Sequence, residues 1–276
     1  MPAYICTGCG VQYPNAEIPP SQCVICRDER RLGVAARQTW TTQEEMRGTH
    51  FNAFRRHEPG LMGVGTLPSF ALGQRALLLR TAQGNILWDC LSFLDDATIA
   101  LIGALGGISA IAASHPHHYG AMIEWSHAFN SAPVYLHAAD RKFITRLDSS
   151  IMFWEDDAFQ VIPGVTLLRV GGHFAGSSVM HWAQGAGGRG ALLASDTLRI
   201  GPDGMISFMR SYPNLIPLDA SSAYRIADKL LAWPFDSIYG GFWDQMVPAD
   251  GQSLLSRACR QFALKRATTS CLLLGQ

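Results

Sequence analysis

Four cysteines in two closely spaced pairs constrain the first 30 residues of this chain more than any other feature. Cys6 and Cys9 form one pair, Cys23 and Cys26 form the other, and 13 residues separate the pairs. Each two-residue gap can fold into a tight knuckle, so four thiolates can surround one metal ion tetrahedrally. A segment this short has no hydrophobic core in which ordinary cysteines could be buried. We therefore predict a closed metal site, structural or electron-carrying, in residues 1–30.

Zinc is the metal expected at this four-cysteine site. Iron stays open, because a tetrahedral set of four sulfurs suits both metals and the segment YICTGCG resembles a rubredoxin-like knuckle. The first 30 residues also lack the apolar stretch of a signal peptide. Since paired thiolate ligands of this kind are typical of a reducing compartment, the sequence favours a cytoplasmic protein.

Composition favours a globular protein that acts on a small molecule. Of 276 residues, 48% are hydrophobic and 16% are charged, with 22 basic and 22 acidic side chains. This neutral balance offers no clustered positive charge for nucleic acid or an anionic membrane.

The uncharged run 97–114 reaches the lower limit for a membrane span, but its glycines and alanines favour a helix followed by a buried strand. A homo-oligomer is compatible with this composition.

From residue 71 onward, predicted strands and helices alternate as in layered α/β proteins. They are a hairpin, two helix-and-strand units, a third helix, a strand-rich middle, another helix, one more strand and a last helix. Their sum is two sheets flanked by helices. The predicted organisation is a ribbon at 1–30, a linker or wrapping segment at 31–70, the main domain at 71–267 and a tail at 268–276.

Histidine and aspartate residues at predicted strand ends form a second chemical motif. His115 and His117 follow a predicted strand, and alternate side chains of an extended stretch point to the same side. Two glycines before His173 allow a tight turn, and Asp196 directly follows another predicted strand. Side chains on loops at strand ends often carry chemistry, so these four could bind one metal ion.

Four segments resemble the metallo-β-lactamase superfamily over about residues 70–245. They are WDC at 88–90, SHPHHYG at 114–120, GGHFAGSSV at 171–179 and ASDTL at 194–198. The resemblance implies a four-layer αββα sandwich, here preceded by a small zinc ribbon. By position, it also implies that His115, His117 and His173 bind the first metal, Asp196 is the bridging carboxylate and Asp89 is a supporting acid.

The departures from the family pattern concern its second metal. Tyr119 stands where the family has an aspartate, Gly120 stands where it has another histidine, and YGGFWD at 239–244 lacks the final histidine. The resemblance therefore implies one zinc or other divalent metal on the three histidines, with Asp196 nearby and an open position for water. Water bound at such a site has a pKa of about 7 and can attack a polarised carbonyl.

Further residues receive predicted roles around this site. Asp196 and Tyr119 are the candidate catalytic groups, although Tyr119 could ligate, donate a hydrogen bond to an oxyanion, or simply pack. His118 should point away from the metal if its loop is extended, as a residue that supports the ligands or lies at the surface. The predicted substrate contacts are Arg210, which could hold a carboxylate or phosphate, Tyr212 and Trp243.

Three functional hypotheses follow. The first is a hydrolase with one metal that cleaves an ester, thioester, amide or lactone-like bond. The second is a metal-binding scaffold without hydrolytic activity, in which the ribbon docks a partner; the lost second-metal ligands favour it. The third pairs a rubredoxin-like iron site with a redox core as in flavodiiron proteins, but that chemistry uses two metals in the core.

Overall fold

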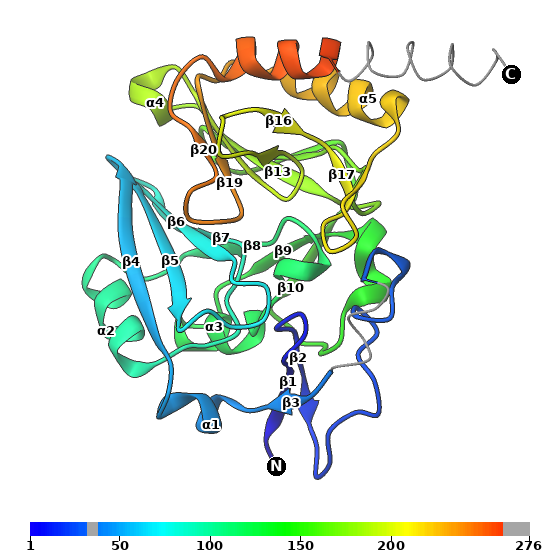
Figure 1. The fold of residues 1–276 in the computed structure, drawn as a ribbon. Coiled ribbons are helices and arrows are strands. Elements are labelled where there is room, and N and C mark those ends of the chain that lie inside the picture. Colours follow the sequence, from blue (N-terminus) through cyan, green and yellow to red (C-terminus); the bar gives the residue numbers. More distant parts are fainter. Residues whose placement is uncertain (32–37, 262–276) are drawn as a thin grey trace, which may run out of the picture.

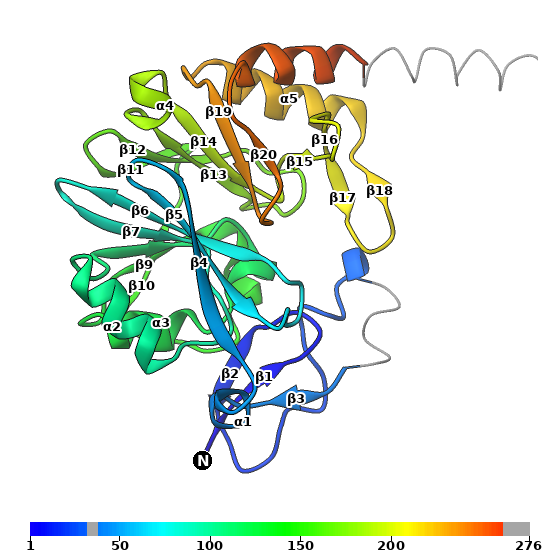
Figure 2. The ribbon, with the colours of Figure 1, turned by 60° about the vertical axis from the view of Figure 1, so that its left-hand side comes forward.

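A computed structural model describes residues 1–31 and 38–261 of the chain. Two sheets are stacked face to face, and helices cover both outer faces (Figures 1 and 2). This arrangement confirms the αββα sandwich and the small N-terminal ribbon that the sequence predicts. The predicted tail at 268–276, and the last residues of the predicted 71–267 domain, lie outside the described residues.

The first sheet has seven strands in the order β10-β9-β8-β7-β6-β5-β4. The strands β4 to β7 pair antiparallel, whereas β7 to β10 pair parallel. Helices α2 (Asp96–Ala104) and α3 (Met122–Ala128) are the crossovers between parallel strands and cover the outer face (Figure 1). The strands are β4 (Phe51–Glu58), β5 (Leu61–Leu67), β6 (Arg75–Thr81), β7 (Gly84–Trp88), β8 (Ala110–Ala112), β9 (Val134–His137) and β10 (Ile151–Trp154).

The second sheet has six strands in the order β11-β12-β13-β14-β19-β20. The amphipathic helix α5 (Ala220–Leu231) and a helix over 251–261 cover its outer face (Figure 2). Two short hairpins, β15 (Arg199–Ile200) with β16 (Ile206–Ser207) and β17 (Met209–Ser211) with β18 (Ile216–Pro217), precede α5. The six strands are β11 (Ala158–Ile162), β12 (Val165–Arg169), β13 (Ser178–Trp182), β14 (Ala191–Ser195), β19 (Ser237–Gly240) and β20 (Met246–Val247).

Apolar side chains of both sheets form the inner core. Leu77 and Trp88 of the first sheet belong to the same buried cluster as Met180 and Leu193 of the second. Each side chain of this size stabilises the fold by ~1.5–3 kcal/mol when fully buried. Because this cluster fixes one sheet on the other, the loops that follow strands of both sheets are held at one edge.

Residues 51–67 differ from the predicted linker or wrapping segment. They form β4 and β5, which complete the first sheet, and a short helix α1 (Gln43–Arg47) precedes them. Because glycine is depleted in strands, the presence of Gly63 and Gly65 prevented the prediction of β5 as a strand. A Cβ at these positions would lie 2.8 and 2.5 Å from the Trp243 ring. The glycines therefore let the indole pack directly against the strand.

The N-terminal ribbon packs against the main domain of its own chain. Its strands β1 (Ala3–Cys6) and β2 (Gln12–Asn15) form a small sheet with β3 (Trp40–Thr41). Backbone N–H of Gln12 donates to the Gly120 carbonyl at 3.0 Å, and Ser92 Oγ donates to the Gly10 carbonyl at 2.8 Å. The four cysteines also share a buried cluster with residues of α2 and α3. The ribbon is thus fixed at the end of the first sheet (Figure 2).

The uncharged run 97–114 folds as predicted into most of α2, a turn and β8. No helix within residues 1–31 and 38–261 is long and apolar enough to cross a bilayer.

Candidate metal centres

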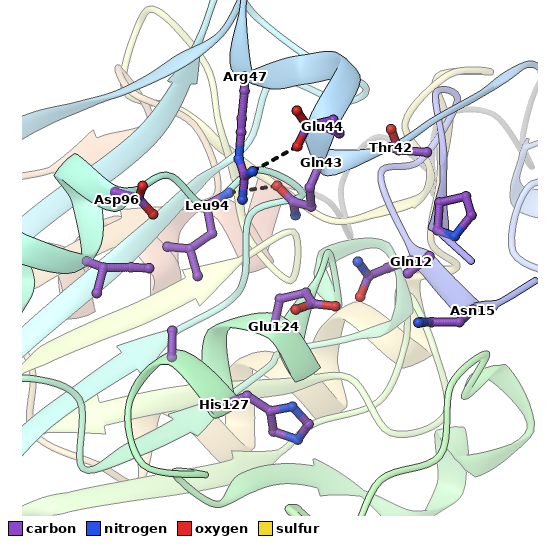
Figure 3. Close-up of a pocket in the computed structure, with 14 residues that line it drawn as sticks. Gln12, Asn15, Thr42, Gln43, Glu44, Arg47, Leu94, Asp96, Glu124 and His127 are labelled. Atoms are coloured by element: carbon purple, nitrogen blue, oxygen red, sulfur yellow. Dashed lines mark hydrogen bonds and ion pairs between the residues drawn. The ribbon is translucent and has the colours of Figure 1, made fainter.

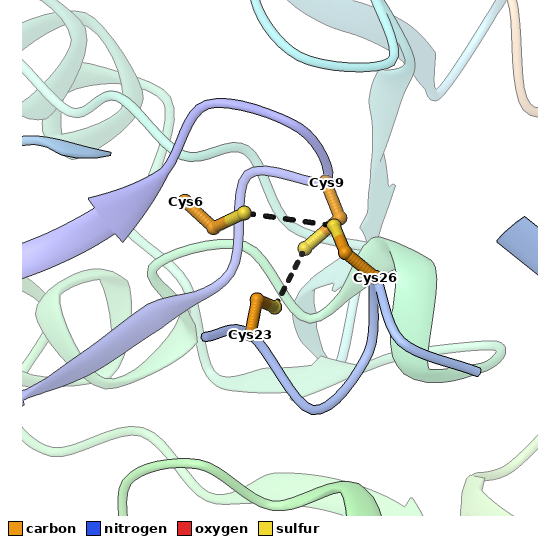
Figure 4. Close-up of side chains that lie close together, drawn as sticks. All are labelled: Cys6, Cys9, Cys23 and Cys26. Carbon is orange, nitrogen blue, oxygen red and sulfur yellow. Dashed lines mark hydrogen bonds between the residues drawn. The ribbon is translucent and has the colours of Figure 1, made fainter. Parts of the chain in front are cut away.

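The four ribbon cysteines converge on one point (Figure 4). The sulfurs of Cys6 and Cys26 are 3.6 Å apart, as are those of Cys9 and Cys23, and all four side chains are buried. Tetrahedral zinc with Zn–S bonds of about 2.3 Å requires sulfurs about 3.8 Å apart. The spacing therefore fits one tetrahedral ion, and we call these residues the four-cysteine group.

Three histidines and an aspartate converge at the edge where strands of both sheets end. His115 and His117 follow β8 of the first sheet. His173 lies in the turn between β12 and β13, and Asp196 directly follows β14. One ligand atom from each lies within 4.8 Å of those of the others. We call these four residues the histidine group.

The geometry of the histidine group matches a single ion. His173 Nε2 lies 3.3 Å from His117 Nδ1, and His115 Nε2 lies 3.5 Å from Asp196 Oδ2. Bonds of about 2.0–2.1 Å to a tetrahedral metal place donors about 3.3–3.4 Å apart. All four residues are at most 4% exposed. Within the described chain, His115 Nε2 and Asp196 Oδ1 have no hydrogen-bond partner. Buried polar atoms without a partner are expected where a metal or a metal-bound water binds.

Burial sets the charge states of the group. Burial and the neighbouring His173 lower the pKa of His117 well below its ordinary value, and burial and His115 lower the pKa of His173 to about 3. Burial by itself would raise the pKa of Asp196, but His118 and His115 hold it below its usual range. At pH 7 the group therefore presents neutral imidazoles and a carboxylate, the forms that bind metals.

Outer hydrogen bonds orient these imidazoles. His173 Nδ1 donates to the Arg210 carbonyl at 3.0 Å, which leaves Nε2 to face His117. Ser114 Oγ lies 2.8 Å from His115 Nδ1, which leaves Nε2 to face Asp196. Metal-binding histidines are usually held in this way by their second nitrogen.

His118 does not point away from the group, contrary to the prediction. Residues 116–118 form a turn of 3-10 helix, η3 (Pro116–His118), instead of an extended stretch. The ring of His118 is fully buried, with Nδ1 3.0 Å from Asp89 Oδ2 and Nε2 3.9 Å from Asp196 Oδ2. Pro116 was the sequence signal for this turn, because proline is favoured at the first position of a helix.

Two buried carboxylates flank His118. Burial by itself would lower the pKa of His118, but Asp89 and Asp196 outweigh that effect and raise it. Asp89 Oδ1 also accepts from the backbone N–H of Ser114 at 2.8 Å. Asp89 thus supports the loop that carries the histidines.

Tyr119 belongs to a buried apolar cluster. Its ring is almost fully buried in the cluster that contains Leu91 and Trp125, beside α3. Burial raises the pKa of its hydroxyl well above the ordinary value. These surroundings match the packing alternative considered for Tyr119.

The three predicted substrate contacts fall in different surroundings. Tyr212 lies beside the histidine group, since its hydroxyl donates to the Asp196 carbonyl at 2.6 Å and its ring centroid is 5.5 Å from that of His173. The Arg210 carbonyl contacts the His173 ring of the histidine group, while the half-exposed Arg210 guanidinium pairs with Glu29. Trp243 instead packs on β5, with the Arg55 guanidinium 5.0 Å from its ring.

Sequence analysis missed two residues beside the group. The Phe174 ring centroid lies 4.9–5.6 Å from those of His115, His117 and His173. Its place directly after His173 was the available signal. Arg30 Nε donates to the His173 carbonyl at 2.5 Å, across 143 residues of sequence. No local pattern could have indicated that contact.

A cavity of about 420 Å³ lies elsewhere, between the ribbon and helices α1, α2 and α3 (Figure 3). Gln12 of β2, Gln43 of α1 and Glu124 of α3 are among its lining residues. It shares no residue with either metal-binding group.

Comparisons with known proteins show which family this chain resembles in sequence. The family model described as the metallo-beta-lactamase superfamily matches residues 70–256. The uncharacterized protein YmaE of Bacillus subtilis (strain 168) is 45% identical over 245 residues, which cover 88% of this chain and 89% of YmaE.

Solved structures share the fold at low sequence identity. The DIM-1 metallo-β-lactamase aligns with a TM-score of 0.58 at 12% identity, covering 78% of this chain and 98% of that chain. The mono-zinc form of FIM-1 from Pseudomonas aeruginosa aligns with a TM-score of 0.55 at 15% identity, covering 78% and 96%.

Proposed function

Because the chain belongs to the metallo-β-lactamase superfamily, we propose that it is a hydrolase that uses a single metal ion held by the histidine group. One observation carries the proposal: four buried donors from both sheets lie at the spacing of one tetrahedral ion. Zinc is the expected ion. A divalent ion here would lower the pKa of a bound water to about 7 and polarise a carbonyl. The expected substrate is a small molecule with an ester, thioester, amide or lactone-like bond.

The backbone around Gly120 supports a single ion. Gly120 has a φ of +51°, and a Cβ there would lie 2.6 Å from the Leu91 carbonyl oxygen. No histidine fits at this position without moving the backbone. The neighbouring Tyr119 is committed to the core. The packing at these two positions, which carry second-metal ligands in the family, therefore supports the proposal of a single ion.

The space around Gly241 supports the same conclusion. A Cβ at Gly241 would lie 2.9 Å from His118 Cε1 and 3.2 Å from Asp196 Oδ1. The His118 ring thus occupies the room that a side chain at Gly241 would need, and Gly241 belongs to the segment that lacks the family's final histidine. We infer that His118 fills much of the space beside Asp196 in which a second ion would otherwise bind.

The chain's own residues supply the remaining functions. Asp196 Oδ1, which has no partner in the described part of the chain, can accept a hydrogen bond from water or substrate. Tyr212 holds the main chain of Asp196, and Arg210 holds the His173 ring. Arg210, Tyr212 and Trp243 stay the proposed substrate contacts.

The rival proposal is a metal-binding scaffold without turnover. The low exposure of the histidine group, at most 4% for each residue, favours it, because a substrate must displace covering side chains to reach the metal. The ribbon would then dock a partner.

Metal counting combined with a hydrolysis panel tests the proposal. We expect two metals per chain in the parent, one in His173→Ala, and two in the control His127→Ala, whose side chain is 45% exposed and pairs with Asp148. Asp196→Asn should lose turnover of an ester, thioester, amide or lactone. Three metals in the parent would contradict the single-ion site. Two metals without turnover of any substrate in the panel would support the scaffold.

A further inference from the structure

A short segment at the end of the ribbon joins the two metal-binding groups. This connecting segment, Asp28–Arg31, begins two residues after Cys26 and includes the 3-10 helix η1 (Glu29–Arg31). Arg31 is 3% exposed, and its Nη2 donates to the Gly8 carbonyl at 2.7 Å. Gly8 lies inside the first cysteine knuckle. One end of the segment is therefore anchored to the four-cysteine group.

Arg30 carries the contact to the histidine group. Its Nε donates to the His173 carbonyl at 2.5 Å, and its guanidinium lies 4.3 Å from the centroid of the Phe174 ring. That ring in turn packs edge-on against His117, with centroids 4.9 Å apart. Arg30 thus holds both the main chain of one ligand and the ring that supports another.

The same segment controls the His173 side chain indirectly. The carbonyl that accepts from His173 Nδ1 belongs to Arg210, and the Arg210 guanidinium pairs with Glu29. Next to it, Ser211 Oγ donates to the Arg30 carbonyl at 2.6 Å. Two hydrogen bonds of His173, one at its carbonyl and one at its ring, therefore end on groups that the connecting segment holds.

We propose that Arg30 is a positioning residue that couples the two metal sites. Metal in the four-cysteine group fixes Cys26 and the connecting segment, and the segment then holds His173 in its metal-binding orientation. The inference rests on the proposed function only in taking the histidine group as a metal site. By linkage, coupling between two sites changes affinity by about 5–150-fold.

The sign of the effect distinguishes positioning from electrostatics. A guanidinium repels a cation, so charge alone predicts that removal of Arg30 would tighten metal binding. Asp28 Oδ1 lies 2.5 Å from Arg30 Nη1 and offsets much of that charge. We therefore expect the loss of positioning to dominate, and the histidine group to bind metal more weakly.

Cobalt titration of the full chain tests the proposal. The thiolate-to-cobalt absorption reports the four-cysteine group, and the weaker visible bands that develop after it saturates report the histidine group. Arg30→Ala should weaken Co²⁺ binding at the histidine group by about 5–150-fold, with unchanged thiolate absorption. Arg30→Lys should recover part of the loss. The control Arg27→Ala, whose exposed side chain directly precedes the connecting segment, should match the parent.

A double-mutant cycle tests the route of the coupling. Cys26→Ser should weaken the histidine group in the parent but add little in the Arg30→Ala background. An unchanged or tighter affinity in Arg30→Ala overturns the inference, as does an equal loss from Cys26→Ser in both backgrounds. A parent that binds no cobalt at the histidine group overturns the inference and the proposed function together, whereas the first two outcomes leave the proposed function intact.

Discussion

Replacing Gly241 by alanine tests how the region beside Asp196 is packed. The added Cβ would lie 2.9 Å from His118 Cε1, whereas ordinary contacts begin at 3.4 Å. The ring must therefore retreat by several tenths of an ångström. It has little freedom to do so, since Asp89 Oδ2 and Ser195 Oγ lie 3.0 and 2.7 Å from its Nδ1.

The expected cost of Gly241→Ala follows from this overpacking. An extra methyl group in a well-packed core costs ~1–3 kcal/mol. In a domain of this size each kcal/mol lowers the melting temperature by roughly 2–4 °C. Because Asp196 Oδ1 would also be approached, at 3.2 Å, metal affinity of the histidine group should fall as well.

Urea unfolding without added metal measures the stability of Gly241→Ala. The matched control is Gly103→Ala in α2, where an added Cβ meets nothing within 4 Å. That change should stabilise the protein by ~0.5–1 kcal/mol, because glycine is unfavourable inside a helix. If Gly241→Ala is as stable as the parent and binds metal equally well, His118 does not fill the space as we argue.

Three further predictions concern stability. In the metal-free protein, the free energy of unfolding should fall as pH drops from about 6.5 towards 3, because the unfolded state protonates His173 at about 6.5 and the folded state only at about 3. Urea unfolding at pH 7 and 4.5 checks this. An equal loss of unfolding free energy between these two pH values in His173→Ala would contradict it. Leu193→Ala, in the core between the sheets, should cost ~2–5 kcal/mol by urea unfolding, and a loss below ~1 kcal/mol would be incompatible with a close-packed core. Tyr212→Phe removes the hydrogen bond to the Asp196 carbonyl and should lower the free energy of unfolding by ~1 kcal/mol. Differential scanning calorimetry should show a lower melting temperature, and an unchanged melting temperature would refute this prediction.

The sequence by itself determined which residues could form the two groups. Metal ligation requires particular side chains at short spacings, so the cysteine pairs and the His115 to His117 spacing are visible without a structure. Apolar periodicity likewise indicates where strands end, which placed His173 and Asp196 on loops. Both kinds of information are local in sequence, and the structure brings the predicted residues together.

Only the tertiary structure decided what surrounds those groups. The ring of His118 turns toward Asp196, 78 residues later, and Gly241 leaves room for it. Arg30 reaches the His173 carbonyl across 143 residues. Such contacts depend on how two sheets and the ribbon pack, and packing complementarity between distant segments leaves no periodic trace in either segment. The same reason explains why β5, whose glycines accommodate Trp243, could not be identified as a strand before the indole was placed.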